Sequence, residues 1–565
     1  MNKVSKGQRH KGTKKRVRKV VPVSARRKAK KVSVINTASQ IKPAVAGAVK
    51  VRRRESKKRY LLVSIVFVLA GIPFLMGKYI EFNSPGPFDS GSNVYSAKHI
   101  LDGARIGIEE EPSAAMGTLI VNMVGVRVFG FNEVGPKVMQ GLLQAVALVL
   151  MFVAMRKLFG MVPASVSVIV CSIYLSSPLI AKFGNVKEQY MVAFMVSAVS
   201  CFVLGRLSGR WWWIFLAGVF AALAPTFKMT GISAGVGLAV FVVMQPIFKQ
   251  GSYKCMIEEV GLLVAGAAAG LFPVYAWLWG TGVGVSYWPY YSVFEMLFGG
   301  DSNSYVSNSR RFSSFSQQWP MVLRYYKLLI LPISLGLGAI VIRLYRMFPG
   351  GMCILKEGQK KSFERFVFMF SVWWVLDMGF VWISPRSYEQ YYLPLTASGA
   401  MLGGYLIAMY LAKVKETVYK VEWGFAGFLA CICMVVMSWH IFFGIERSPN
   451  SGSFYGRKSR GYTQRLGEIS RRRQRDIKFE WEKIGDHIRE HSEVSDRIYV
   501  WGWYPGIYVR AQRLSPAAKA FTSEMHVMAP AELAKEIGEL LESFGKDSPK
   551  FVVDSRKRHY PWDRP

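Results

Sequence analysis

Long apolar stretches alternate with short polar ones along most of this chain. The apolar stretches recur between Leu61 and Phe443, and their length of about 17–24 residues is enough for a helix to cross the ~30 Å hydrocarbon core of a bilayer. The pattern predicts a polytopic α-helical membrane protein with eleven spans. These spans are residues 60–77, 138–157, 162–181, 189–205, 211–226, 231–248, 259–279, 328–345, 366–383, 392–411 and 422–443.

The basic residues of the loops test this count independently. In membrane proteins, Lys and Arg concentrate in the loops on the cytoplasmic side. If the N-terminus is cytoplasmic, every loop that falls on that side is basic. These loops contain Arg156, Lys157, Arg206, Arg210, Lys249, Lys254, Arg343, Arg346, Lys356, Lys360, Lys361, Arg365, Lys413, Lys415 and Lys420. Because eleven is odd, the C-terminal region is predicted to be extracytoplasmic.

The N-terminal tail has a composition of its own. Residues 1–59 hold 22 Lys or Arg and a single acid, Glu55, and so supply +21 of the net charge of +37. A block of like charge does not fold, which predicts a disordered cytoplasmic tail. Anionic lipids of the membrane are the favoured partner of this tail, and nucleic acid is the disfavoured alternative.

The hydropathy also divides the rest of the chain. Residues 60–445 form the predicted transmembrane domain, whose first extracytoplasmic loop is 78–137. This loop includes a short apolar stretch, 116–130, expected to lie in the interface. Residues 446–475 form a polar linker. Beyond it, a helical periodicity, a strand at 497–502, a helix at 530–545 and a strand at 550–554 predict a small extracytoplasmic α/β domain, 476–565.

The predicted extracytoplasmic loops contain a small set of polar candidates. They are Asp89, Glu188, Lys228, Arg386, Glu389, Tyr391 and Tyr392. A carboxylate such as Asp89 can accept a proton from an attacking hydroxyl as a general base. Lys and Arg at the membrane interface can hold an anionic phosphate. Together these residues suit transfer of a group from a lipid phosphate.

Each candidate also has a structural interpretation. Asp89 lies in a loop rich in Gly, Ser and Pro, where an Asp is usually a turn residue. Glu188 is also interpreted as a helix N-terminal acid, Lys228 as an anchor that reaches the headgroups, and Arg386 as part of the interfacial belt. Asp377, inside a predicted span, is either functional or paired with a neighbouring helix.

Several motifs resemble those of the polyprenyl-phosphate-sugar-dependent GT-C glycosyltransferases, the group that includes protein O-mannosyltransferases and aminoarabinose transferases. The motifs are FDSGSNVYSAKHILDG, VFGFNEVGPKVMQGLLQAVALVLMFVAMRKLFG, PTFKMTG and YEQYYLPLTASGAML, and the C-terminal DRIYVWGWYPGIYVRAQRLSPAAKAF is similar to bacterial members. The resemblance implies a GT-C fold, Asp89 as the catalytic base and Lys228 facing the phosphate of the lipid donor.

The sequence departs from the family pattern at two points. Asp89 is followed by Ser90, whereas the protein O-mannosyltransferases carry an Asp-Glu pair there. Glu-Glu-Glu-Pro at 109–112 replaces the His-Pro-Pro of many bacterial relatives, and leaves Glu110 and Glu111 as secondary acids or, alternatively, a divalent cation site. Nothing in the sequence requires a metal or cofactor, and the six cysteines form no CxxC pair.

The leading hypothesis is a membrane glycosyltransferase that moves a sugar from a polyprenyl-phosphate donor to a hydroxyl acceptor on a lipid, glycan or protein. The resemblance implies a multi-pass protein of the bacterial inner membrane, with the reaction on the extracytoplasmic side. A transporter or flippase of lipid-linked glycans is one alternative, although the sequence lacks the internal repeat common in transporters. A non-enzymatic membrane scaffold is the other.

Overall fold

The computed structural model describes residues 64–65, 68–84, 86, 88–177, 180, 184–248, 251–291, 315–345, 357–383, 389–416, 478–521 and 528–555. The chain divides into two compact units, Met1–Phe67 and Val68–Pro565, and the second holds every element named below. The predicted tail at 1–59, the linker at 446–475, the predicted span at 422–443 and Arg386 lie outside the described residues.

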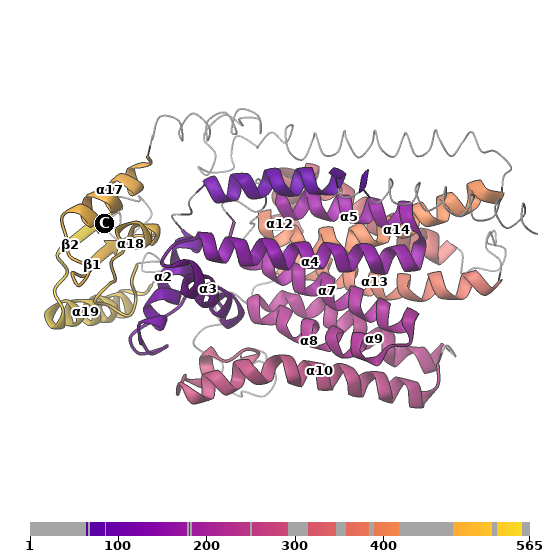
Figure 1. Cartoon of the computed structure of the whole chain (residues 1–565), viewed down its shortest axis with the longest axis horizontal. Helices are drawn as coiled ribbons and strands as arrows, with labels where there is room; N and C mark the ends of the chain where they lie inside the picture. Colours follow the sequence, from indigo (N-terminus) through magenta and orange to yellow (C-terminus); the bar gives the residue numbers. More distant parts are fainter. Residues whose placement is uncertain are drawn as a thin grey trace, which may run out of the picture. The chain divides into compact units, whose positions relative to one another are not determined.

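Helices make up nearly all of the described part before residue 417 (Figure 1). Residues 68–83 are helical. The helices that follow are α2 (Asp89–Leu101), α3 (Met116–Phe129), α4 (Val134–Phe159), α5 (Met161–Ser176), α7 (Lys187–Ser208), α8 (Trp211–Phe227), α9 (Ile232–Ile247), α10 (Tyr253–Gly280), α12 (Phe315–Tyr345), α13 (Glu357–Ile383) and α14 (Leu393–Glu416). The short 3₁₀ turns are η2 (Met229–Gly231), η3 (Val285–Tyr287) and η4 (Glu389–Tyr392).

Five helical segments of the described residues are long and apolar enough to cross a membrane. They are Val134–Phe159, Lys187–Ser208, Met229–Ile247, Tyr253–Gly280 and Gln390–Met409, and shorter apolar helices accompany them. The α7 segment is 78% buried inside the protein, whereas the α10 segment is only 6% buried. An apolar helix that neighbouring helices leave uncovered suits contact with lipid, and α10 is therefore a lipid-facing helix of the bundle.

Small residues allow these helices to approach closely. A Cβ atom added at Gly218 of α8 would lie 2.2 Å from the carbonyl oxygen of Leu263, and one at Gly266 of α10 would lie 2.0 Å from that of Phe215. Helices that pack in lipid commonly use such glycines, because association there depends on close van der Waals contact. The α8–α10 contact tolerates no side chain at either position.

The C-terminal elements begin at α17 (Glu480–Glu490) and continue as β1 (Ile498–Trp501), α18 (Gly506–Ala511), α19 (Pro530–Lys546) and β2 (Phe551–Asp554). The two strands pair in parallel, with Ile498 opposite Phe551. The helices α17 and α19 and both strands lie where the sequence predicted them, whereas α18 was not predicted. The stretch predicted to hold one or two interfacial helices, 116–130, forms the single helix α3.

The C-terminal elements share a hydrophobic core with the region around α2. The ring centroids of Tyr95 in α2 and Tyr508 in α18 are 4.7 Å apart, and the backbone N–H of Ser515 donates to the Tyr95 hydroxyl at 3.1 Å. A Cβ atom added at Gly91 would lie 2.5 Å from the backbone nitrogen of Gly506. The start of α2 is thus in direct backbone contact with the C-terminal elements.

Candidate functional site

Lys228 lies at a break between two helices. Pro225 sits in the last turn of α8, and after Phe227 the backbone becomes extended at Lys228 before η2 begins. This break places the Lys228 ammonium 2.9 Å from Glu188 Oε1, in the first turn of α7. The same nitrogen lies 3.1 Å from the centroid of the Tyr391 ring, a cation–π contact. Three of the predicted residues, distant in sequence, are therefore brought together.

A small cavity opens beside the Lys228 ammonium. Its volume of ≈ 30 Å³ is enough to hold a small polar group, such as a phosphate oxygen or a hydroxyl. The cavity is lined by Lys228, Thr230, Asp377, Phe380, Val381, Tyr391 and Pro394. A cation, a carboxylic group and an aromatic ring thus face the same space.

The charged pair at this cavity has spare hydrogen-bonding capacity. Lys228 carries three N–H donors and gives one to Glu188, its one hydrogen bond among the described residues. Glu188 is 1% exposed, and its Oε2 is buried without a hydrogen-bond partner in the described part of the chain. Burial lowers the pKa of Lys228, and the charge of Glu188 opposes that shift. The pair can accept a further ligand on both its positive and its negative member.

Asp377 reaches the cavity from α13. Its two carboxylic oxygens contact the hydroxyls of Ser233 in α9, at 2.6 Å, and Ser398 in α14, at 2.8 Å. The sequence left open whether this intramembrane acid is functional or pairs with a neighbouring helix. The structure joins it to two neighbouring helices and also exposes it to the cavity.

Asp89 occupies a different position. It is the exposed first residue of α2, and it does not line the cavity of Lys228. The next residue, Ser90, accepts a hydrogen bond from Asn185 Nδ2 at 3.2 Å, and the ring of Phe88 lies 5.1 Å from that of Tyr504. Asp89 therefore stands at the junction between the helix bundle and the C-terminal elements.

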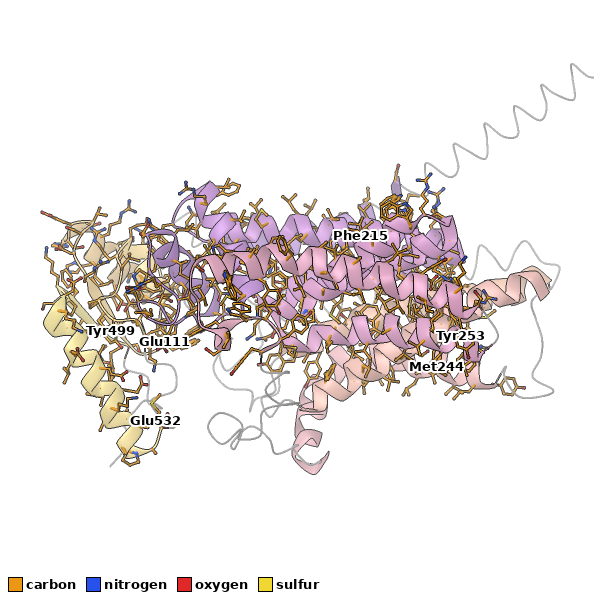
Figure 2. All side chains as sticks on the ribbon, turned by 90° about the horizontal axis from the view of Figure 1, so that it is seen from below. Glu111, Phe215, Met244, Tyr253, Tyr499 and Glu532 are labelled. Atoms are coloured by element: carbon orange, nitrogen blue, oxygen red, sulfur yellow. The ribbon has the colours of Figure 1, made fainter. Side chains whose placement is uncertain are left out.

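Glu110 and Glu111 have partners elsewhere. Glu110 accepts from Ser96 Oγ at 2.5 Å and contacts His99 Nδ1 at 2.9 Å, which ties the loop to α2. Glu111 lies against the C-terminal elements (Figure 2), where its N–H donates to the Ala518 carbonyl and its side chain is 3.6 Å from the ammonium of Lys519. Neither acid lines the cavity, and no group of three or more His, Cys, Asp or Glu among the described residues could hold a metal.

Two other positions complete the comparison with the sequence. Tyr392, the last residue of η4, is 4% exposed, while its neighbour Tyr391 contacts Lys228. Asn185 was not among the predicted residues, although it bonds to Ser90 beside Asp89. The Gly184-Asn185 pair just before α7 is an ordinary turn signal, and it could have drawn attention to this position.

The chain has recognisable relatives. Residues 115–277, a segment that includes Glu188 and Lys228, match the family model described as dolichyl-phosphate-mannose-protein mannosyltransferase. In fold, the chain is similar to ArnT from Cupriavidus metallidurans bound to undecaprenyl phosphate, with a TM-score of 0.52, 14% identity, and coverage of 88% of this chain and 89% of that one.

A second similar structure is the archaeal oligosaccharyltransferase AglB from Archaeoglobus fulgidus, in complex with an inhibitory peptide and a dolichol-phosphate. Its TM-score is 0.49, its identity 13%, and the match covers 88% of this chain and 69% of that one. No curated protein sequence matches the chain. The family match covers one segment of the chain, and the likeness to ArnT shows a shared helical fold. They confirm the resemblance to the polyprenyl-phosphate-sugar-dependent GT-C glycosyltransferases.

Proposed function

We propose that this protein is a membrane glycosyltransferase that transfers one sugar from a polyprenyl-phosphate donor to a hydroxyl on a lipid, glycan or protein. The observation that carries the proposal is the Lys228 ammonium at its cavity, within the segment that matches the family model. A half-buried cation with two N–H donors that no described residue uses suits the phosphate of a donor whose lipid stays in the bilayer. The donor is expected to approach from the membrane and offer one phosphate oxygen to this cavity.

Glu188 and Tyr391 set the strength of that interaction. Glu188 holds the ammonium in place and keeps it charged in a buried setting, and Tyr391 covers one side of it. Arg386, four residues before Gln390 in the sequence, is proposed as the second cation for the donor phosphate. Such charges are worth most where water is scarce, so the departing lipid phosphate is stabilised at the membrane surface.

Asp89 is proposed as the general base. It accepts the proton of the acceptor hydroxyl as that oxygen bonds to the anomeric carbon of the sugar, while the bond from that carbon to the phosphate oxygen breaks. Polyprenyl phosphate then leaves with the electron pair. The exposure of Asp89 suits an acceptor that arrives from water, whereas Lys228 meets a donor from the membrane. Two substrates would thus enter from two directions.

The proposed setting is the bacterial inner membrane, with the N-terminus in the cytoplasm and the reaction outside it. The basic residues of the alternate loops support this orientation, as the positive-inside rule relates them to the cytoplasm. In it, residues 1–59 would contact the anionic lipids of the cytoplasmic leaflet.

The test is a transfer assay with the purified full-length protein in liposomes. The donors are undecaprenyl phosphates that carry a radiolabelled hexose or pentose, and acceptors are offered as lipid, glycan and peptide fractions. The proposal expects label to move from the lipid to one acceptor fraction, with release of undecaprenyl phosphate. Label that crosses the bilayer while the sugar–phosphate bond stays intact would instead identify a flippase. No cleavage of any donor with every fraction would contradict the proposal.

A further inference from the structure

Asn185 adopts an unusual backbone conformation just before α7. Its φ is +53°, in the left-handed region that residues other than glycine seldom enter, although asparagine enters it more readily than most. The residue is fully buried. A buried non-glycine residue persists in this conformation only where its surroundings hold it there, and such positions concentrate at functional sites.

The side chain of Asn185 is at the centre of a polar network. Its Nδ2 donates to Ser90 Oγ at 3.2 Å and to Asn122 Oδ1 at 2.8 Å. Its Oδ1 accepts from the Tyr190 hydroxyl at 2.9 Å and from Asn122 Nδ2 at 3.2 Å. Its backbone N–H donates to Gln140 Oε1 at 3.2 Å. Both donors and the acceptor of one amide are used, which fixes its orientation.

The network links the starts of two helices. Ser90 follows Asp89 at the beginning of α2, and Asn122 belongs to α3. Asn185 itself precedes the first turn of α7, where Glu188 holds Lys228. A hydrogen bond therefore joins Ser90, the neighbour of Asp89, to Asn185, and three residues of backbone lead from Asn185 to Glu188.

We propose that Asn185 is a positioning residue that fixes Asp89 relative to the Glu188–Lys228 pair. The catalytic significance of this link rests on the function proposed above, whereas the link itself is a property of the fold. Transfer needs the acceptor oxygen and the anomeric carbon at a defined distance, and a displacement of about 1 Å can reduce a rate by on the order of 10²-fold. The rigid Asn185 amide, between Asp89 and the Glu188–Lys228 pair, maintains that distance.

The test compares three variants of the full-length protein in nanodiscs. Asn185→Gly keeps the left-handed backbone accessible and removes the side chain. Ser90→Ala removes only the acceptor on α2. Gln245→Ala is the matched control, since Gln245 is an equally buried amide whose bonds to Arg206 and Glu259 lie at the other end of α7. Amide hydrogen exchange is followed in residues 88–93 and 186–191, and transfer kinetics are measured in parallel.

In Asn185→Gly, exchange should rise about fivefold in both segments, as expected for the loss of bonds worth about 1 kcal/mol each. In Ser90→Ala the rise should be confined to 88–93, and the double variant should match Asn185→Gly in that segment. In transfer, kcat should fall about tenfold or more in Asn185→Gly with a smaller change in the KM for the donor. Gln245→Ala should leave both segments and kcat unchanged.

Unchanged exchange of 88–93 in Asn185→Gly would overturn the proposal, as would an equal response in Gln245→Ala. If Asn185→Gly does not fold, additive effects of Ser90→Ala and Asn185→Asp on the exchange of 88–93 would overturn it, and non-additive effects would support it. Exchange reports on the link even where no donor is cleaved, so failure of the function is distinguishable from failure of the link.

Discussion

Helix α7 carries a buried ion pair at each of its ends, and the two pairs differ in how completely they are satisfied. In the last turn, Arg206 pairs with Glu259 and also donates to Gln245 Oε1 at 2.6 Å, while Gln245 donates to the second oxygen of Glu259 at 3.2 Å. In the first turn, Lys228 pairs with Glu188 alone, and the second oxygen of Glu188 has no partner among the described residues.

The difference separates a structural cluster from a candidate site. The cluster at Arg206 satisfies both carboxylate oxygens of Glu259, and it joins α7, α9 and α10 into one unit. An incomplete pair beside a cavity costs stability and persists where a ligand completes it. The presence of a buried charge alone would not have distinguished the two ends. Their hydrogen-bond inventories do.

The largest expected effect on stability is at the Arg206 end of α7. Arg206→Met leaves the Glu259 carboxylate buried without its cation, which should lower the free energy of unfolding by about 3–5 kcal/mol. Arg206→Met/Glu259→Met should recover much of that loss. Denaturation of the protein in detergent measures both. Transfer per folded molecule should remain at the wild-type level. A loss of transfer in Arg206→Met would show that the two ends of α7 do not differ in function.

The largest expected effect on a ligand is at the Lys228 end of α7. Lys228→Met should weaken the binding of undecaprenyl phosphate by about 100-fold, the loss of a charge-assisted contact worth roughly 2–3 kcal/mol. Titration of this lipid into the protein in nanodiscs measures the effect. Lys228→Met/Glu188→Gln controls for the unpaired carboxylate and should bind as weakly. Wild-type affinity in the double variant would remove Lys228 from the donor site.

The next prediction concerns the contact between α2 and the C-terminal elements. Gly91→Val places side-chain atoms where the backbone of Gly506 lies, and should lower the free energy of unfolding by about 1–3 kcal/mol through overpacking. Because Asp89 lies two residues away, transfer should fall while the affinity for undecaprenyl phosphate stays constant. Gly261→Val is the control, since a Cβ atom there meets nothing within 4 Å. An equal loss of transfer activity in Gly91→Val and Gly261→Val would show that α2 has no special role in transfer.

The smallest expected effect is on stability, at an ion pair within the C-terminal elements. Hydrogen bonding to the Arg510 guanidinium lowers the pKa of Asp486 below its usual value. The ionised Asp486 therefore stabilises the folded state at neutral pH, and this stabilisation is lost as pH falls through the lowered pKa. Asp486→Asn should reduce stability by about 1 kcal/mol or less at pH 7, because the pair is partly exposed. The difference from wild type should shrink in thermal denaturation below about pH 4.

The sequence predicted the positions of most described helices, because apolar length identifies a membrane helix directly. It was less accurate at their ends: α12 begins at Phe315 and not at residue 328, and α13 at Glu357 and not at 366. Hydropathy reports the apolar part of a helix, whereas the helix continues into its polar flanks.

The candidate site was predictable in part. Glu188, Lys228 and Tyr391 were selected because they lie in predicted loops on the same side of the membrane. The structure brings them into contact. Asn185 was not selected, since its role depends on a left-handed backbone and on partners from three other helices. The partners of Glu110 and Glu111 likewise come from folding, and no spacing in the sequence indicates them.

Asp89 is proposed as the base of a sugar transfer from a polyprenyl phosphate. Its most direct test is the transfer rate of Asp89→Asn in liposomes, with the labelled donor that the wild-type protein cleaves. Asp102→Asn, which removes an exposed carboxylate at the other end of α2, is the matched control. The account predicts that Asp89→Asn folds and binds undecaprenyl phosphate normally but transfers no measurable sugar, while Asp102→Asn transfers at the wild-type rate. Wild-type transfer by Asp89→Asn would contradict it.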